Sequence, residues 1–496
     1  MATVAADSRP PNVIFIIADD LGYGELGSYG QQRIHTPHLD QMAAEGMRFT
    51  QMYSGNAVCA PSRSVLMTGK HPGHTYVRDN RQWSKARLMP KLGKPEFEGQ
   101  EPLPSEVFTL VEAMKGNGYT TGGFGKWGLG GPTSTGEPLK QGFDRWFGYN
   151  CQAVAHNFYP TYLWDNDSTI SLNNPPFSAH DSLKPEEDPN DPQSYTRFQG
   201  KEYAPDLINE AALDFARKHK DRPFFLYWPT TAPHVALQVP DDSLHEYVGK
   251  WNDPPYPGGN GYIPHFSPLA AYAAMITRMD RDIGQMVKLI SELGLERDTV
   301  FVFTSDNGAL CGTHQGLAGT DCAFFQSCGP LRDGKGSYYE GGIRVPCIVK
   351  WKGVIKPQSV SHRVCGFEDW FPTLLDLTGK PTLAQDLDGI SFAPTLCGET
   401  QPEREFLYRE FPSYGGQQVV RSGKWKMVRR DLSPKANAKK KGKVTAPRLE
   451  LYDLENDIGE TKDLAGENPE IVERLLDIAK REHQPSTVFP FPALDP

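Results

Sequence analysis

Near its start the sequence reads Asn12-Val13-Ile14-Phe15-Ile16-Ile17-Ala18-Asp19-Asp20, a short apolar run that ends in two carboxylates. An apolar run of this length, rich in β-branched residues, is typical of a strand buried in a parallel sheet. A second run, Thr299-Val300-Phe301-Val302-Phe303-Thr304-Ser305, ends in the same way at Asp306-Asn307-Gly308. The two runs predict an α/β fold in which two strands finish in oxygen-bearing side chains.

These terminal side chains should meet, because ligands of open α/β sheets bind at the carboxyl ends of the strands. We expect Asp19, Asp20, Asp306 and Asn307 to converge on one point. Three carboxylates crowded there would repel one another unless a cation lay among them. Oxygen ligands suit Ca²⁺ or Mg²⁺ rather than Zn²⁺. Either pair taken alone is equally consistent with an ordinary turn after a strand.

A third feature is the run Cys59-Ala60-Pro61-Ser62-Arg63, which predicts the start of a helix. Pro61 fits a first helical turn, and residues 62–68 can continue the helix until Gly69 ends it. Cys59 would then lie at the helix N-terminus, where free backbone N–H groups and the helix dipole favour an anion. Arg63 could hold a tetrahedral oxyanion. A lone cysteine is more often a buried core residue, so its role depends on its surroundings.

Those surroundings include further motifs in a characteristic order. They are Thr36-Pro37-His38-Leu39-Asp40, Gly125-Lys126-Trp127, Pro233-His234, Ser305-Asp306-Asn307-Gly308 and Gly334-Lys335-Gly336-Ser337-Tyr338-Tyr339-Glu340-Gly341-Gly342-Ile343-Arg344-Val345-Pro346. Together with the Cys-x-Pro-Ser-Arg run, this ordered set resembles the type I, formylglycine-dependent sulfatases of the alkaline phosphatase superfamily. The resemblance implies a large mixed, mostly parallel sheet sandwiched by helices.

The resemblance also implies a chemistry for Cys59. In that family a separate formylglycine-generating enzyme oxidises this cysteine to an aldehyde, whose hydrate is the nucleophile in sulfate ester hydrolysis. It implies a divalent cation, Ca²⁺ or Mg²⁺, held by Asp19, Asp20, Cys59, Asp306 and Asn307. It also implies catalytic roles for other residues. Asp306 would help to deprotonate the nucleophile, and Arg63 would lie beside the nucleophile. Lys126 and Lys335 would bind the sulfate oxygens, and His234 with Lys335 would act at the leaving oxygen. The implied activity is sulfuric ester hydrolysis on a sulfated carbohydrate.

One family motif is altered in this chain. Where many relatives read Gly-Lys-Trp-His-Leu-Gly, the sequence reads Gly125-Lys126-Trp127-Gly128-Leu129-Gly130, so the histidine that usually assists sulfate release is missing. His156 and His314 are candidates to replace it, and each can instead contact substrate or be an ordinary loop histidine. With Arg78, they form our set of candidate substrate-binding residues. The run from Gly73 to Asn80 is similar to the corresponding run in sulfatases that act on sulfated galactose-type or hexosamine sugars.

Two other activities remain open at this point. The first is a phosphonate monoester or phosphodiester hydrolase of the same superfamily, because the site would bind any tetrahedral anion. The second is a sulfated-glycan-binding pseudoenzyme, for which the glycine at position 128 would reflect lost catalysis. Turnover of aryl sulfate against aryl phosphodiester separates the hydrolases.

Length and charge restrict the remaining possibilities. A chain of 496 residues exceeds a single core, and we predict a catalytic domain over residues 1–387 and a second domain over 388–496. The net charge of -9 argues against nucleic acid as a partner, and it requires any attraction of a sulfated substrate to be local. No segment is long and apolar enough for a membrane span. No signal peptide is visible either, and we expect a periplasmic or secreted protein whose signal peptide is absent here, without excluding the cytoplasm.

The second domain shows short strand-like runs followed by one helix-like run. The strands are expected at residues 406–408, 418–421, 425–428 and 449–452, and the helix from Pro469 to His483. This order predicts a small antiparallel sheet with one helix packed on it. The basic run from Lys435 to Lys443 is expected to be a solvated hairpin loop.

Loops and cysteines complete the prediction. Polar insertions at roughly 79–105, 160–205 and 238–268 are candidates for substrate selection or for simple surface decoration. Their aromatic stretches, Phe158 to Trp164 and Tyr256 to Phe266, could stack on sugars or belong to the core. If Cys59 is modified, seven cysteines remain. Three of these form one group along the chain, either with a disulfide or as reduced thiols: Cys311, Cys322 and Cys328.

Overall fold

Strand β1 (Asn12–Ala18) lies at the centre of the main sheet, with β7 (Phe224–Pro229) and β8 (Thr299–Ser305) as its parallel neighbours. The structure is a computed structural model, and it describes residues 9–83, 95–379, 386–433 and 446–495. Within these residues the main sheet has 11 strands. Its order is β10 (Ser359–Ser361), β2 (Met47–Tyr53), β9 (Arg344–Lys350), β8, β1, β7, β3 (Thr120–Lys126), β4 (Arg145–Tyr149), β5 (Tyr162–Asp165) and β6 (Ser168–Ser171), with β11 (Cys365–Gly366) beside β2.

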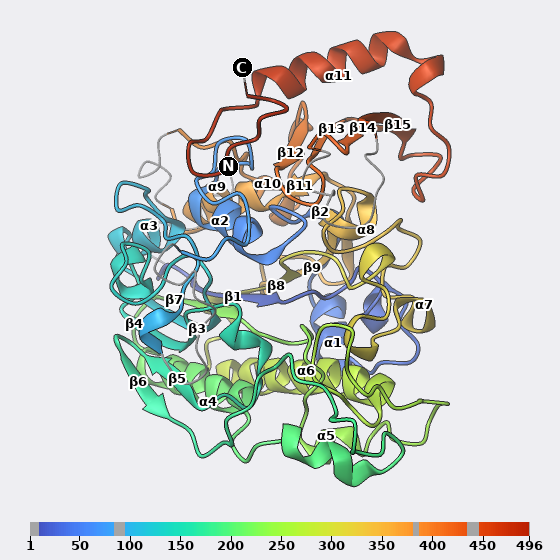
Figure 1. Cartoon of the computed structure of the whole chain (residues 1–496). Helices are drawn as coiled ribbons and strands as arrows, with labels where there is room; N and C mark the ends of the chain where they lie inside the picture. Colours follow the sequence, from blue (N-terminus) through green and yellow to red (C-terminus); the bar gives the residue numbers. More distant parts are fainter. Residues whose placement is uncertain (1–8, 84–94, 380–385, 434–445, 496) are drawn as a thin grey trace.

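The strands β8, β1, β7, β3 and β4 are parallel, whereas pairing around β9 and at the β4–β5–β6 edge is antiparallel. The predicted mixed, mostly parallel sheet is therefore confirmed. Figure 1 shows helices above and below this sheet. Alternation along β1 explains the two layers, because successive side chains of a strand point to opposite faces.

One face of β1 presents Val13, Phe15 and Ile17, and the other presents Ile14 and Ile16. The first face packs in the core of α2 (Cys59–Thr68), α3 (Leu110–Gly116), α9 (Trp370–Leu377) and α10 (Ala393–Leu396). The second face packs in the core of α1 (Pro37–Ala44), α4 (Ala204–Lys218) and α6 (Pro268–Glu292). The remaining helices before the C-terminal sheet are short: α5 (Asp241–Leu244), α7 (Cys322–Phe325) and α8 (Glu340–Ile343).

The C-terminal part is an antiparallel sheet with one helix, as predicted. Its order is β12 (Leu407–Phe411), β13 (Gln417–Ser422), β14 (Trp425–Arg430) and β15 (Arg448–Asp453), and α11 (Pro469–Arg481) packs on it. A separate apolar cluster joins this sheet to the part of the chain that carries the main sheet, and it contains Val419 and Val428 together with Val58 and Tyr339. The second sheet thus rests directly on the segment that leads into α2.

Two sequence predictions about this part remain unsettled. The boundary between residues 387 and 388 stays a prediction, and Phe392 just beyond it packs in the α9 core with Trp370. The basic run from Lys435 to Lys443 lies outside the described residues.

The second of the three polar insertions, at roughly 160–205, contains a β-hairpin. Residues 162–171 form the β5–β6 hairpin, which extends the edge of the main sheet. In the stretch from Phe158 to Trp164 the aromatic side chains are buried, so these belong to the core and are not a sugar platform. Part of the first insertion, residues 84–94, lies outside the described residues. None of the described helices combines the length and the hydropathy needed to cross a membrane.

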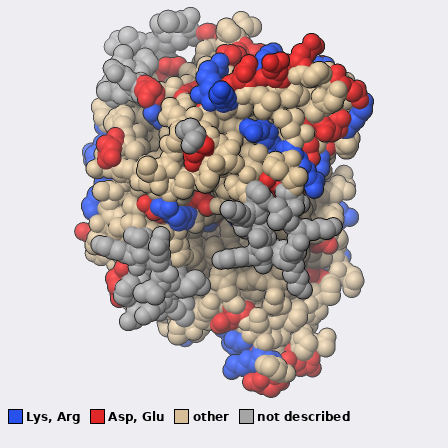
Figure 2. Space-filling view, turned by 45° about the horizontal axis from the view of Figure 1, so that its top comes forward, with Lys and Arg blue, Asp and Glu red and all other residues tan. Residues whose placement is uncertain are grey.

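Acidic side chains dominate part of the surface, with basic ones among them. Figure 2 shows red Asp and Glu residues gathered along the upper edge of the face that it presents. The outer side of α11 contributes Glu470, Glu473 and Asp477 beside Arg474 and Lys480. The global field therefore gives no attraction for an anionic substrate, and any such attraction has to arise inside the site.

Candidate active site

Helix α2 begins at Cys59, and all ten of its residues are buried. Val58 before it is extended, and Gly69 after it adopts the left-handed conformation with φ 65°, which glycine tolerates without a steric penalty. The expected helix, with Cys59 in its first turn, is confirmed. Only 1% of Cys59 is exposed, so its side chain lies in an enclosed environment.

The ends of β1 and β8 bring the four predicted oxygen-bearing residues together. Ala18 pairs with Ser305, so the residues that follow leave the sheet side by side. The backbone N–H of Asp20 donates to Asp306 Oδ1 at 3.2 Å, and Asn307 Nδ2 donates to Asp20 Oδ1 at 2.8 Å. Cys59 Sγ lies 3.2 Å from Asp19 Oδ1. The parallel register of β1 and β8 therefore brings both acidic turns together, and Cys59 at the start of α2 lies beside them.

Three basic side chains enter the same cluster. Lys126 Nζ lies 2.5 Å from Asp19 Oδ2 and 3.8 Å from Cys59 Sγ. Lys335 Nζ lies 2.7 Å from Asp20 Oδ1 and 3.7 Å from Cys59 Sγ. On the far side, Arg63 forms two hydrogen bonds with Asp306 Oδ2, at 3.1 Å through Nε and 2.9 Å through Nη2.

This balance corrects one argument from the sequence. We expected three crowded carboxylates to require a cation, but each acid here has a basic partner: Asp19 with Lys126, Asp20 with Lys335, and Asp306 with Arg63. Their formal charges cancel without a metal ion. Carboxylate repulsion alone is therefore no evidence for a bound cation.

A different observation fits a cation. Asn307 Oδ1 is buried and has no hydrogen-bond partner among the described residues, whereas its Nδ2 has two acceptors. Buried carbonyl oxygens without partners are costly, and a hard cation would satisfy this one. Asp19, Asp20, Cys59 and His234 each offer a ligand atom, and these atoms lie within 4.8 Å of one another. The donor set is thus mainly oxygen, with His234 as an addition that we did not predict.

Burial and charge shift the pKa values of the cluster. Burial would raise the pKa of Asp19, but Lys126, His234 and Arg63 hold it well below its usual range. Burial and the neighbouring Asp19 raise the pKa of Asp306 to about 6, despite Arg63. Burial, Asp19 and Asp306 raise the pKa of the Cys59 thiol well above its usual range. An unmodified Cys59 is therefore a poor nucleophile near neutral pH, because the thiolate is the reactive form.

His234 follows β7 and faces the cluster. Its Nε2 lies 3.6 Å from Asp20 Oδ2, and its Nδ1–H donates to the carbonyl oxygen of Val235. Burial, Lys335 and Lys126 lower its pKa. The ring of His156 stacks on it, with centroids 4.6 Å apart and planes at 10°. His156 in turn contacts His180, whose Nδ1 donates to the Gly261 carbonyl oxygen at 2.6 Å.

The backbone conformation of Gly128 disfavours a larger side chain at this position. Its φ of 86° is unfavourable for any other residue, and a Cβ at this position would lie 2.4 Å from Gln152 Nε2. The Gln152 side chain fills the adjacent space, is 5% exposed, and its Nε2 has no partner among the described residues. Sequence analysis missed Gln152, although it lies only four residues before His156.

The other candidate substrate-binding residues have different surroundings. His314 lies near Lys335, and burial and Lys335 lower its pKa. Arg78 is buried, and its guanidinium binds Glu410 at 2.7 Å and the carbonyl oxygens of Thr75, Gly73 and Gln484. These internal contacts tie the segment that follows α2 to the C-terminal part, and they argue against a substrate contact for Arg78.

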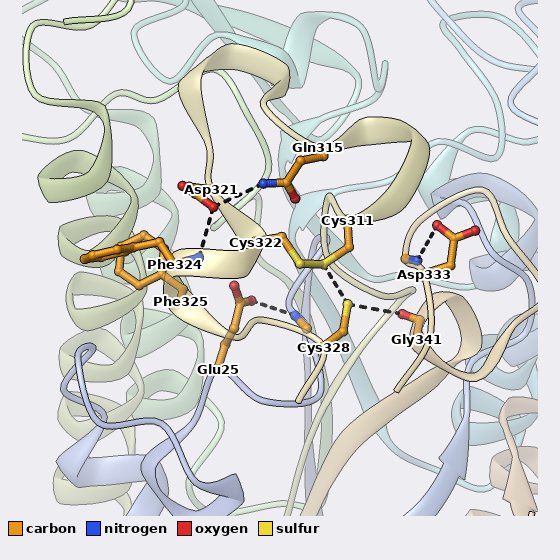
Figure 3. Close-up of a disulfide and its surroundings, with 12 residues drawn as sticks. Glu25, Cys311, Gln315, Asp321, Cys322, Phe324, Phe325, Cys328, Asp333 and Gly341 are labelled. Atoms are coloured by element: carbon orange, nitrogen blue, oxygen red, sulfur yellow. Dashed lines mark hydrogen bonds between the residues drawn. A yellow bond between two sulfur atoms is a disulfide. The ribbon is translucent and has the colours of Figure 1, made fainter. Parts of the chain in front are cut away.

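The three grouped cysteines lie beside the Asp306 turn. Figure 3 shows a disulfide between Cys311 and Cys322, with Cys328 below it. Cys328 Sγ lies 2.7 Å from Cys311 Sγ. The disulfide closes the loop that carries His314. Of the two states left open by the sequence, the structure therefore contains the disulfide.

We expect Cys322→Ser to retain a disulfide, because Cys328 is close enough to pair with Cys311 instead. Non-reducing peptide mass spectrometry should find Cys311 linked to Cys328 in this variant. In Cys322→Ser/Cys328→Ser no partner remains, and the free energy of unfolding should fall by about 3 kcal/mol, the usual value for a loop of this length. A free Cys311 in the single variant would contradict the expected exchange of partners.

Comparisons with known proteins agree with this geometry. The Sulfatase family model matches residues 11–380, and the model for the N-sulphoglucosamine sulphohydrolase C-terminal region matches residues 334–482. Human arylsulfatase A is 32% identical over 99% of this chain and 91% of its own length. Rat N-acetylgalactosamine-6-sulfatase is 32% identical over 82% of this chain and 69% of its own.

A solved structure connected with the metabolism of multiple glycosaminoglycans by Bacteroides thetaiotaomicron has the same fold. It superposes with a TM-score of 0.72 and 27% identity, over 96% of this chain and 99% of that one. The sequence matches cover both acidic turns, helix α2 and the three basic residues. This chain therefore belongs to the sulfatase family and is a sulfuric ester hydrolase.

Proposed function

We propose that this enzyme removes sulfate from a sulfated carbohydrate, with Cys59 converted to formylglycine by a formylglycine-generating enzyme. We further propose that Asp19, Asp20, Asp306 and Asn307 hold Ca²⁺, or Mg²⁺ in its place. The observation that carries this proposal is the position of Cys59 in the first turn of α2, between two lysines and two acidic turns. The unpartnered Asn307 Oδ1 supports the cation.

Formylglycine would supply a hydrated aldehyde as nucleophile, and the cation would supply charge that polarises the sulfate ester. Arg63 holds Asp306 in place through two hydrogen bonds, so that the Asp306 carboxyl can take a proton near position 59. Lys126 and Lys335 flank Cys59 at 3.8 and 3.7 Å, where their ammonium groups can bind sulfate oxygens. Both lysines are buried, which strengthens these contacts relative to water.

The charge balance of the cluster favours an anionic substrate. Asp19, Asp20 and Asp306 are balanced by Arg63, Lys126 and Lys335, so a divalent cation would give the site a net charge of about +2. A sulfate ester carries one negative charge and would be attracted locally. This explains how a chain with a net charge of -9 can bind a sulfated molecule.

His234 and Lys335 are the groups proposed at the leaving oxygen, and Lys335 is the proton donor, because the lowered pKa of His234 leaves its Nε2 without a proton while its Nδ1–H is bonded to Val235. His234 Nε2 points to the cluster, because its Nδ1–H is engaged by Val235. Lys335 stays charged, since Asp20 and Cys59 raise its pKa well above the usual range despite burial. Proton donation by a positioned side chain is required because an alkoxide is a poor leaving group.

The sugar itself is proposed from the relatives and from the rim of the site. N-acetylgalactosamine-6-sulfatase and the Bacteroides structure concern sulfated sugars, and we propose a galactose-type or hexosamine sulfate here. His156 beside His234 and His314 beside Lys335 are the proposed substrate contacts. The Cys311–Cys322 disulfide supports a periplasmic or secreted location, because disulfides persist in oxidising compartments.

The direct test is sulfate release from a panel that contains galactose 6-sulfate, N-acetylgalactosamine 6-sulfate, N-acetylgalactosamine 4-sulfate and sulfated disaccharides. We expect turnover of at least one member and of an aryl sulfate. A large preference for an aryl phosphodiester over the aryl sulfate would favour the phosphodiesterase alternative. Tight binding of a sulfated sugar without sulfate release, by protein shown to carry formylglycine, would favour the pseudoenzyme.

Removal of divalent cations should abolish most activity. We expect treatment with a chelator to lower kcat at least about 100-fold, because electrostatic stabilisation of several kcal/mol is withdrawn from the reacting ester. The melting temperature should fall as well, since Asn307 Oδ1 again lacks a partner. Restoring activity with Ca²⁺ or Mg²⁺ in separate titrations identifies the ion, and full activity in the chelated protein would contradict the cation.

A further inference from the structure

Tyr414 is a half-exposed tyrosine with a strained backbone conformation. It lies between β12 and β13, and 49% of it is exposed. Its φ of 52° places it in the left-handed region, where bulky residues are rare and strained. The next two residues are Gly415 and Gly416, with φ of 90° and 75°. A glycine at position 414 would relieve this strain, so the tyrosine is kept at a cost to stability.

The ring of Tyr414 borders the active site. A Cβ on Gly336, the residue after Lys335, would lie 2.7 Å from Tyr414 Cε1, so the ring lies directly against that glycine. The His314 ring is 5.7 Å away by centroids. Phe411 supports the ring by stacking at 5.4 Å and 28°. One side of the tyrosine is thus fixed by Phe411, and a large part of its surface remains open to solvent.

The hairpin that carries Tyr414 is anchored to the nucleophile helix. Ser413 Oγ donates to Asp79 Oδ2, and the next residue, Asn80, accepts a hydrogen bond from the Ala60 backbone N–H at 2.8 Å. The backbone N–H of Gly336 donates to the Ala57 carbonyl oxygen at 2.8 Å. Tyr414 is therefore held in a defined position relative to Cys59, although it belongs to the C-terminal sheet.

We propose that Tyr414 is the stacking platform for the sugar ring of the sulfated substrate. An exposed aromatic ring beside a polar site offers a flat apolar face that matches the C–H face of a pyranose. The proposal rests on the proposed function, because it takes the ligand to be a saccharide sulfate. The sugar ring gains no charge in the reaction, so stacking on Tyr414 contributes the same binding free energy to the substrate and to the transition state. Its loss should therefore raise KM and leave kcat unchanged.

The test is Tyr414→Gly, measured with the panel member of highest kcat/KM. We expect KM to rise about tenfold with kcat changed by less than about twofold, and the melting temperature to stay equal or increase. Tyr414→Phe keeps the ring and should behave as the wild type. Inhibition by inorganic sulfate should be unchanged in both variants, since sulfate alone does not reach the platform.

Gln358→Gly is the matched control. Gln358 is also exposed with φ 57°, and it lies before β10 at the edge of the main sheet. In this variant glycine removes the strain of the left-handed backbone, so the melting temperature should increase while KM does not change.

Three results would overturn the proposal: an unchanged KM in Tyr414→Gly, a fall in kcat of the same size as the change in kcat/KM, or a marked loss of stability. If the wild type released no sulfate from any panel member, the proposed function would fail separately. Calorimetric binding of N-acetylgalactosamine 6-sulfate to wild type and Tyr414→Gly would then test the platform alone, with equal affinities counting against it.

Discussion

Replacement of Cys59 by alanine is expected to lower kcat for sulfate release by about 10⁴-fold or more, the loss typical of removing a catalytic nucleophile. Cys59 lies in the first turn of α2 and within 4 Å of both Lys126 Nζ and Lys335 Nζ. Alanine keeps the helix and these basic side chains but removes the reacting group. The measurement is initial-rate release of sulfate from the best substrate of the panel, with the melting temperature as a check on folding.

Cys59→Ser tests whether that loss comes from the missing aldehyde hydrate or only from the missing polar group at position 59. Serine supplies a hydroxyl of similar size but no aldehyde hydrate as long as it is not itself oxidised, so the turnover of Cys59→Ser protein whose serine is shown by mass spectrometry to be unoxidised should be as low as that of alanine. Mass spectrometry of the peptide that contains residue 59 should show formylglycine in active wild-type protein. Full activity in wild-type protein whose Cys59 is an unmodified thiol would contradict the proposal. That outcome is also disfavoured by the raised pKa of the thiol.

The fold was predictable because its signals are local. The runs that became β1 and β8 are continuously apolar, and their pairing from Asn12 with Thr299 to Ala18 with Ser305 follows from parallel strands of equal length. The motif residues at their ends could be placed for the same reason. The boundary at residue 387 could not be tested in this way, because the two parts share an apolar cluster that contains Val58 and Val419.

The rest of the site depends on contacts between distant segments. Gln152 fills the space at Gly128, which requires the left-handed backbone of that glycine and the return of the chain after β4. Tyr414 reaches the site from a hairpin more than 300 residues after Cys59 in the sequence. Arg78 was assigned to the substrate because it follows the nucleophile helix, but its partner Glu410 is on β12. Charge type is visible in a sequence, whereas the partner of a charge is not.

Arg63→Leu is expected to reduce both stability and activity. Arg63 is fully buried and bonds Asp306 Oδ2 at 2.9 and 3.1 Å, so its loss leaves a buried carboxylate without its cation. Removing one partner of a buried ion pair costs about 3–5 kcal/mol of unfolding free energy. In protein without a bound cation, the pKa of Asp306, already about 6, should rise further. We expect kcat to fall by about 10²–10³-fold, measured on the folded protein.

Arg409→Leu is the matched control, because Arg409 is equally buried and bonds Glu368 with two nitrogen atoms at 2.8 and 3.0 Å. It should lower stability while the specific activity of the folded fraction stays near that of the wild type. Arg63→Lys keeps the charge without the two-pronged bond, so it should recover part of the stability and little of the rate. Equal losses of activity in Arg63→Leu and Arg409→Leu would mean that Arg63 acts only through the fold. A larger loss of activity in Arg63→Leu would instead show that Arg63 acts on the reaction, by holding the Asp306 carboxylate and balancing its charge beside the reacting group.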